Sequence, residues 1–278
     1  MKNNVGIMQG RLSPPINNAI QAFPFNTWEK EFELANKIGF HNIEWIVDSK
    51  DNPIFNGLEL QKIIKNSTKY GIKINSLCAD YFMTNKLFSE SKNELEENLE
   101  IAKKIIELCH ILKIRIIEIP LVDSSSIRDV NDRKEFLTNF QLILPTIEKY
   151  NVTVALETDL ESKILRDLII EINHPGIALN YDIGNSTANN FDIKKEWELL
   201  HDWIVNVHIK DRLISKNTVP LGSGDANFEE FFDLLKKYNY KGDLIIQGAR
   251  EDLDNNSTLP VVTCKKYLEF VKQYLDKY

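Results

Sequence analysis

The feature that most constrains the fold is a regular alternation of short β-branched segments with longer amphipathic ones along all 278 residues. Several short segments are almost continuously apolar, as strands buried on both faces of a parallel sheet are. The predicted strands are Val5–Gln9, Asn42–Val47, Lys73–Ala79, Ile114–Pro120, Val152–Glu157, Ile177–Asp182, Ile204–Lys210 and Asp243–Gln247. The predicted helices are Thr27–Ile38, Leu58–Tyr70, Lys92–Leu112, Asp132–Tyr150, Glu161–Ile172, Asp192–His201, Phe228–Tyr238 and Cys264–Leu275.

Eight strand–helix pairs predict an α/β fold, a single (β/α)8 TIM barrel that forms one domain over residues 1–278. An open doubly wound sheet is the alternative, but the segment 6–11 after the first strand lacks the G-x-G-x-x-G spacing of a dinucleotide-binding turn. No Pro/Gly-rich linker divides the chain. The longest irregular segments, 10–26, 81–90, 123–130 and 211–227, all follow predicted strands, where a barrel builds its active site.

Charge and composition exclude several classes of partner. The net charge of -7 argues against a nucleic-acid backbone as ligand. The N-terminal residues lack the apolar run of a signal peptide, and no stretch approaches the length of a membrane span. Three widely separated cysteines have no metal-ligand spacing and are predicted to be buried, reduced thiols. We therefore expect a cytoplasmic protein with neither a membrane nor a nucleic-acid partner.

Polar residues end four successive predicted strands: Glu157, Asp182, His208 and Gln247. A single carboxylate at such a position is as often a helix cap or an ion-pair partner as a ligand. In a barrel, however, these four strand ends converge on one side of the mouth. Two carboxylates, an imidazole and an amide oxygen suit one divalent metal ion (Mn²⁺, Co²⁺, Mg²⁺ or Zn²⁺), and the absence of thiolates argues against a structural zinc site.

Basic residues also follow strand ends and are candidates for binding a phosphate or carboxylate of a substrate. Lys210, Arg212 and Arg250 are predicted as substrate-binding residues, and the turn 222–224 could add backbone N–H donors. Arg11 also follows a strand end and is a weaker candidate for the same role. The alternatives are that Lys210 pairs with Asp211 and that Arg11 braces the opening loop. Glu44, near another strand end, is also predicted to contact the substrate.

At these positions the chain resembles the sugar phosphate isomerase/epimerase family, the xylose isomerase-like barrels. The resemblance is carried by Ala155-Leu156-Glu157, by Asn180-Tyr181-Asp182-Ile183-Gly184-Asn185, by Val207-His208-Ile209-Lys210-Asp211-Arg212, by Pro220-Leu221-Gly222-Ser223-Gly224-Asp225 and by Tyr240-Lys241-Gly242-Asp243-Leu244-Ile245-Ile246-Gln247. It implies a metal held by Glu157, Asp182, His208 and position 247, and a homodimer. Position 247 is commonly Glu in the family. Gln247 can offer an oxygen to a cation but cannot accept a proton as a carboxylate does.

The resemblance implies proton abstraction next to a carbonyl, with Glu157 as the base. Because Gln247 removes the second base of a two-base epimerisation, the first expectation is a metal-dependent isomerase of a small sugar or sugar phosphate, acting through an enediolate. The alternatives are a ketose 3-epimerase in which Glu44 or Glu118 replaces that base, an inosose dehydratase-like lyase, and a non-catalytic sugar-binding barrel. A repair nuclease is disfavoured by the acidic charge and the few histidines.

Overall fold

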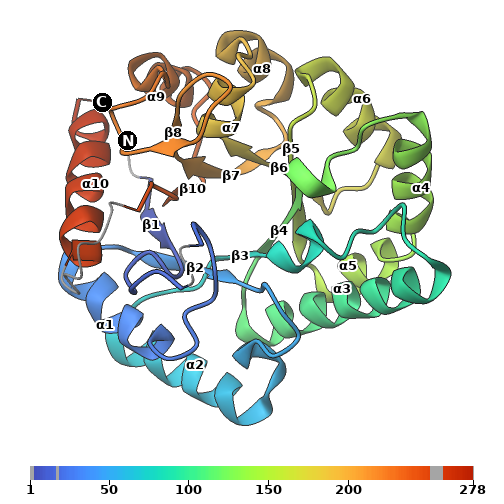
Figure 1. Cartoon of the computed structure of the whole chain (residues 1–278), viewed down its shortest axis with the longest axis horizontal. Helices are drawn as coiled ribbons and strands as arrows, with labels where there is room; N and C mark the ends of the chain where they lie inside the picture. The colour runs from blue at the N-terminus through green and yellow to red at the C-terminus, as the bar shows by residue number, and fades with distance from the viewer. Residues whose placement is uncertain (1–2, 17–18, 251–258, 278) are drawn as a thin grey trace.

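The strands form a closed parallel barrel surrounded by helices (Figure 1). A computed structural model describes residues 3–16, 19–250 and 259–277. Around the barrel the strands follow the order β1-β10-β7-β6-β5-β4-β3-β2, which confirms the predicted (β/α)8 fold. Their bounds are β1 Val5–Met8, β2 Asn42–Ile46, β3 Ser76–Cys78, β4 Ile116–Leu121, β5 Thr153–Thr158, β6 Ile177–Asp182, β7 Ile204–Ile209 and β10 Asp243–Ile246.

Helices connect the strands on the outside of the barrel (Figure 1). Their ends carry the residues that cap helices: Ser91 and Glu94 form a capping box, and Gly39 and Gly71 end two helices with positive φ angles of 99° and 65°. The helices are α1 Trp28–Ile38, α2 Gly57–Tyr70, α3 Lys92–Leu112, α4 Val130–Phe140, α5 Leu144–Tyr150, α6 Ser162–Ile172, α7 Ile183–Ala188, α8 Ile193–Leu200, α9 Phe228–Lys237 and α10 Leu259–Leu275. Short 3-10 helices occupy Pro53–Phe55, Asp80–Met83 and Asp123–Ser125.

Three connections differ from the prediction. The single helix predicted over 132–150 is wrong: the chain forms α4 and α5, with Pro145 in the first turn of α5, where its missing N–H costs no helical hydrogen bond. The short helix α7 follows β6 directly. The predicted loop 211–227 contains a small antiparallel hairpin, β8 Asp211–Arg212 with β9 Thr218–Val219.

The interior of the barrel holds a small apolar cluster and a larger set of polar side chains. Successive side chains of a strand point to opposite faces, so every second residue points into the barrel. Strands β1, β2, β3 and β10 contribute the apolar cluster: Met8, Ile46, Cys78 and Ile245. Buried polar residues lie on strands β2, β3, β4, β6 and β7: Glu44, Ser76, Glu118, Asn180, Asn206 and His208. These polar side chains determine where a ligand can be held.

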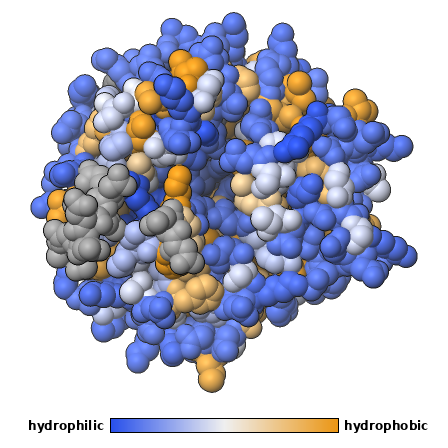
Figure 2. All heavy atoms as spheres, viewed as in Figure 1, coloured by the Kyte–Doolittle hydropathy of each residue, from blue (hydrophilic) through white to orange (hydrophobic). Residues whose placement is uncertain are grey.

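On the face drawn in Figure 2, hydrophilic side chains predominate and apolar ones occur in small separate groups, as is usual for a protein surface. The three cysteines are free and buried, as predicted. Among the helices that the described residues form, none combines the length and the apolar character that a membrane span requires.

Candidate metal centre and substrate cavity

The ends of β5, β6 and β7 bring two carboxylates and one imidazole together. One potential ligand atom each from Glu157, Asp182 and His208 lies within 4.8 Å of the others, and all three residues are buried. His208 Nδ1 lies 3.0 Å from Glu157 Oε2 and 3.9 Å from Asp182 Oδ2. The strand register pairs Asp182 with His208, so neighbouring strands present these groups at the same level. Three of the four residues predicted as metal ligands are thus adjacent in space.

His208 is held in one orientation by a carboxylate beneath it. Its Nε2 lies 2.7 Å from Glu44 Oε1, and the other oxygen of Glu44 accepts a hydrogen bond of 2.8 Å from Asn206. Although burial lowers the pKa of His208, the charges of Glu44 and Glu157 raise it well above its usual value. Nε2 donates its proton to Glu44, so Nδ1 is the nitrogen that faces Glu157 and Asp182. A bound cation would displace the proton of Nδ1, and the freed lone pair would then have the orientation found in a metal-binding histidine.

The two carboxylates are also fixed by their neighbours. Glu157 accepts hydrogen bonds from Asn180 (2.5 Å) and Asn185 (2.7 Å), and Asp182 Oδ1 accepts one from the backbone N–H of Asn185 (2.8 Å). The other oxygen of Asp182, Oδ2, lies on the side of His208. A buried cluster of oxygen and imidazole donors, each oriented by a second residue, fits a divalent cation of the Mg²⁺, Mn²⁺, Co²⁺ or Zn²⁺ type.

Gln247, the fourth predicted ligand, directly follows β10. Its backbone N–H donates to Ile209 O, which places it beside the end of β7. Its Nε2 donates a hydrogen bond of 2.9 Å to Gln21 Oε1. Its Oε1 is buried and has no hydrogen-bond partner among the described residues. An unpaired buried amide oxygen is costly, and a cation or a substrate hydroxyl would satisfy it.

A cavity of about 570 Å³ opens above this cluster, and Glu118, Glu157, Lys210, Arg212 and Gln247 are among the residues that line it. Its volume lies in the range of small-molecule sites. Glu118, on β4, is nearly inaccessible, and one of its carboxylate oxygens has no partner among the described residues. Burial and then the charge of Glu157 raise the pKa of Glu118 well above its usual value, which favours the protonated carboxyl.

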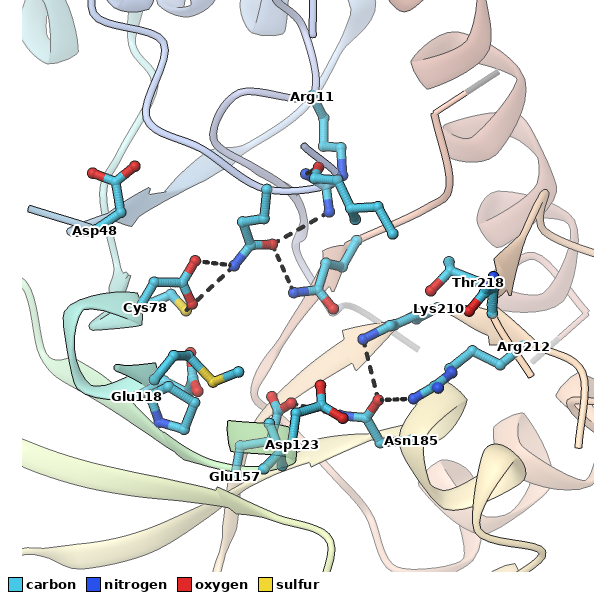
Figure 3. Close-up of a pocket in the computed structure, with 18 of the residues that line it drawn as sticks. Arg11, Asp48, Cys78, Glu118, Asp123, Glu157, Asn185, Lys210, Arg212 and Thr218 are labelled. Atoms are coloured by element: carbon cyan, nitrogen blue, oxygen red, sulfur yellow. Dashed lines mark hydrogen bonds between the residues drawn. The ribbon is translucent and has the colours of Figure 1, made fainter. Parts of the chain in front are cut away.

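Lys210 and Arg212 converge on Asn185 at one side of the cavity (Figure 3). Lys210 Nζ lies 3.1 Å from Asp182 Oδ2 and 3.2 Å from Asn185 Oδ1, and Arg212 Nη1 donates to Asn185 Oδ1 at 2.9 Å. The structure shows Lys210 paired with Asp182, not with the adjacent Asp211. Two cationic side chains therefore border the same cavity as the candidate ligands Glu157 and Gln247.

The predicted anion-binding turn 222–224 has no free N–H groups to offer. Gly222 and Gly224 donate their backbone N–H groups to Asp211, at 2.8 and 2.9 Å, and Ser223 donates its own to Pro220 O. Asp211 is fully buried and organises the segment that carries Arg212. The suggestion that this turn binds a phosphate through its amides is wrong, because a carboxylate of the protein already uses them.

Two residues predicted to bind substrate lie outside the lining of this cavity. Glu44 is fully buried beneath His208. Arg250 donates to the backbone oxygens of Gly10 (2.7 Å), Ser13 (3.0 Å) and Ile20 (3.0 Å), and so braces the loop that follows β1. Arg11 does line the cavity, and it also donates to Gly248 O.

Sequence reasoning missed the amide side chains that organise the site. Asn180 and Asn206 orient Glu157 and Glu44, and Asn185 links Glu157 to both cationic residues. Asparagine is depleted in strands, so its occurrence inside the apolar strands 177–182 and 204–209 was an available signal. Gln21 lies in a long loop and carried no such signal.

A parallel barrel with carboxylates, an imidazole and a polar cavity at the carboxyl ends of its strands belongs to the TIM-barrel class, whose functional sites lie at this face. Within that class the chain belongs to the xylose isomerase-like TIM barrel family, whose family model matches residues 32–259. This confirms the resemblance inferred from the motifs.

Curated relatives and solved structures agree with this family. The protein SgbU of Haemophilus influenzae is 30% identical over 268 residues, 89% of this chain and 93% of its own length. The L-ribulose-5-phosphate 3-epimerase UlaE of Escherichia coli K12 is 28% identical over 262 residues, 90% of each chain. The crystal structure of a D-allulose 3-epimerase from Methylomonas sp. has the same fold, with a TM-score of 0.75 at 16% identity over 98% of each chain. A zinc-bound structure of the protein IolI gives a TM-score of 0.75 at 17% identity over 98% of this chain and 99% of IolI.

Proposed function

We propose that this chain is a divalent-metal-dependent epimerase or isomerase of a small phosphorylated ketose. The observation that carries the proposal is the cluster of Glu157, Asp182 and His208 at a cavity bordered by Lys210 and Arg212. The relative UlaE, named as an L-ribulose-5-phosphate 3-epimerase, supports this choice of substrate class because it matches over 90% of each chain.

Glu157 is the group we assign to proton abstraction. It lines the cavity, and its carboxylate is held by Asn180 and Asn185, so it is fixed relative to a bound substrate. When bound, the metal would supply Lewis acidity toward two substrate oxygens and stabilise the negative charge that develops on them. Glu157 removes the proton beside the carbonyl, and the electron pair of the broken C–H bond forms the enediolate.

The fate of the enediolate separates the two reactions. Isomerisation needs one carbon base: Glu157 returns the proton to the neighbouring carbon on the same face, while the hydroxyl proton of the carbon that was deprotonated passes to the former carbonyl oxygen. Epimerisation needs a proton from the opposite face, and Gln247 cannot supply it. Of the two carboxyls considered as replacements, Glu44 lies beneath His208, whereas Glu118 lines the cavity and has a raised pKa, which favours its protonated form. Glu118 is therefore the candidate second group if the reaction is an epimerisation.

The distal end of the substrate is assigned to Lys210 and Arg212. Their cationic groups share Asn185 as a hydrogen-bond acceptor on the side of the cavity, and Thr218 lines the same region. For Arg212, a charge-assisted hydrogen bond to a phosphate would replace a weaker contact with the neutral amide of Asn185, while Lys210, paired with Asp182, would add a second positive charge. A sugar phosphate is thus preferred to an uncharged sugar.

The first test is the metal content of protein purified without chelator, measured by plasma mass spectrometry beside Asp182→Ala. Near-stoichiometric Mn, Co, Mg or Zn that disappears in the variant supports the centre. Absence of metal from both proteins, even after incubation with each ion, contradicts it.

The second test follows solvent exchange by NMR, with L-ribulose 5-phosphate and each metal in D₂O. Deuterium at C3 together with the C3 epimer identifies an epimerase, and an aldose product with deuterium at C2 identifies an isomerase. If none of the metal ions supports exchange, and if Glu157→Gln leaves ligand binding unchanged, a non-catalytic sugar-binding barrel would be favoured.

A further inference from the structure

The amide of Gln247 is held by a chain of hydrogen bonds that begins outside the candidate metal centre. Gln247 Nε2 donates to Gln21 Oε1 at 2.9 Å, and Gln21 Nε2 donates to Asp80 Oδ2 at 2.5 Å. Arg11 Nη2 also donates to Gln21 Oε1, at 3.3 Å. In Figure 3 the dashed lines that start at Arg11 and at Cys78 meet at one amide side chain, that of Gln21. Gln21 thereby connects the loop after β1 with the ends of β3 and β10.

The neighbours of Gln21 determine which end of its amide faces which side. A guanidinium group only donates hydrogen bonds, so the atom of Gln21 that faces Arg11 is the oxygen. The amide nitrogen is then directed to the carboxylate of Asp80. Because Gln21 Oε1 is an acceptor, the atom of Gln247 that faces it is the nitrogen. The orientations of both amides therefore follow from Arg11 and Asp80.

This orientation leaves Gln247 Oε1 on the side away from Gln21, buried and without a partner among the described residues. Gln247 lies two residues beyond Ile245, which pairs with His208, so its side chain points into the barrel beside the candidate ligands. It also lines the cavity together with Glu157.

We propose that Gln21 is a positioning residue that aims the amide oxygen of Gln247 at the metal, and that it makes position 247 specific for an amide. A carboxylate at 247 would place an oxygen against the oxygen of Gln21. Gln21 could relieve that contact only by reversing its amide, which would put its nitrogen against Arg11 and its oxygen against Asp80. The inference rests on the proposed function in taking Gln247 as a ligand of the metal centre.

The test titrates Co²⁺ alone into the metal-free protein and its variants, with affinity from calorimetry and ligand geometry from the visible absorption of the ion. Gln21→Met keeps the length of the side chain and removes both hydrogen-bonding groups. We expect it to weaken Co²⁺ binding about tenfold and to change the absorption spectrum, a typical effect of losing an outer-shell partner. The exposed Gln61→Met on α2 serves as the matched control and should change neither. Thermal unfolding of each metal-free variant identifies those that fail to fold.

The effect of Gln21→Met on Co²⁺ affinity should depend on the residue at position 247. In Gln247→Met, adding Gln21→Met should have no further effect, because the amide that it positions is gone. In Gln247→Glu, adding Gln21→Met should strengthen Co²⁺ binding, because the opposing oxygen is removed. Co²⁺ binding to Gln21→Met within twofold of wild type, or equal weakening in every background, overturns the inference while the metal centre stands. No Co²⁺ binding to the wild-type protein overturns both.

Discussion

Glu44→Gln tests whether the metal centre depends on the carboxylate beneath His208. Glu44 has no exposed surface and accepts hydrogen bonds from His208 Nε2 (2.7 Å) and Asn206 Nδ2 (2.8 Å). Glutamine keeps the shape but brings an NH₂ group against one of these two donors. One buried donor therefore loses its acceptor, which costs about 1–3 kcal/mol. His208 also loses the negative charge that makes it a basic ligand.

The expected result is a tenfold to hundredfold loss of metal affinity, roughly 1.4–2.7 kcal/mol, the range found for outer-shell partners of metal-binding histidines. The free energy of unfolding of the metal-free protein should also fall, by up to about 3–5 kcal/mol, because a buried histidine–carboxylate pair loses one of its charges. Calorimetric titration of the chelator-treated protein with Zn²⁺ or Mn²⁺ measures the first effect, and urea unfolding measures the second.

Glu118→Gln is the matched control, since Glu118 is the other buried carboxyl in the group around His208. Because its pKa is raised, glutamine removes less negative charge at position 118 than at position 44. Its metal affinity should therefore change by less than about threefold. Wild-type affinity in Glu44→Gln, or an equal loss in Glu118→Gln, would refute the assignment of Glu44 as the partner that orients His208.

Three further predictions concern other parts of the molecule. Glu157→Gln should slow the exchange of substrate protons with D₂O by about a hundred- to ten-thousand-fold, and unchanged exchange by NMR would show that another group is the base. Arg212→Met should raise KM for a ketose phosphate about tenfold, with little change in kcat or in the use of the unphosphorylated sugar; steady-state kinetics on both substrates decides this. Burial raises the pKa of Glu196 from 4.5 to about 7, against the hydrogen bonds from Ser186 and Tyr181. Between these values the folded state binds more protons than the unfolded state, so wild-type stability should fall by up to about 3 kcal/mol as the pH rises through this window. Because the pKa of the buried Glu31 is also raised to about 7, Glu196→Gln should keep part of the fall but show a smaller one than wild type in urea unfolding at about pH 5 and about pH 8. An equal fall in both proteins would contradict the assigned role of Glu196.

Much of the fold was predictable because it depends on local patterns. The eight barrel strands and most helix ends follow from apolar periodicity, capping residues and glycines at positive φ, each of which acts within a few residues of the chain. The single helix predicted over 132–150 was wrong because the backbone turns at residues 141–143, just before α5 begins with Leu144 and Pro145, while apolar residues continue through that turn. The candidate ligands Glu157, Asp182 and His208 were also visible in the sequence, because each is a polar residue at or near the end of an apolar strand.

The amino-acid sequence by itself determined the class of the molecule: a barrel of the xylose isomerase-like family with polar residues at four neighbouring strand ends. Only the tertiary structure decided what each polar residue does, because the contacts join strands and loops far apart in the chain. Glu44 meets His208 across the barrel, Arg250 braces the loop after β1, and Gln21 reaches Gln247 over more than two hundred residues. No local periodicity encodes such contacts, since they depend on closure of the barrel and on the register of its strands.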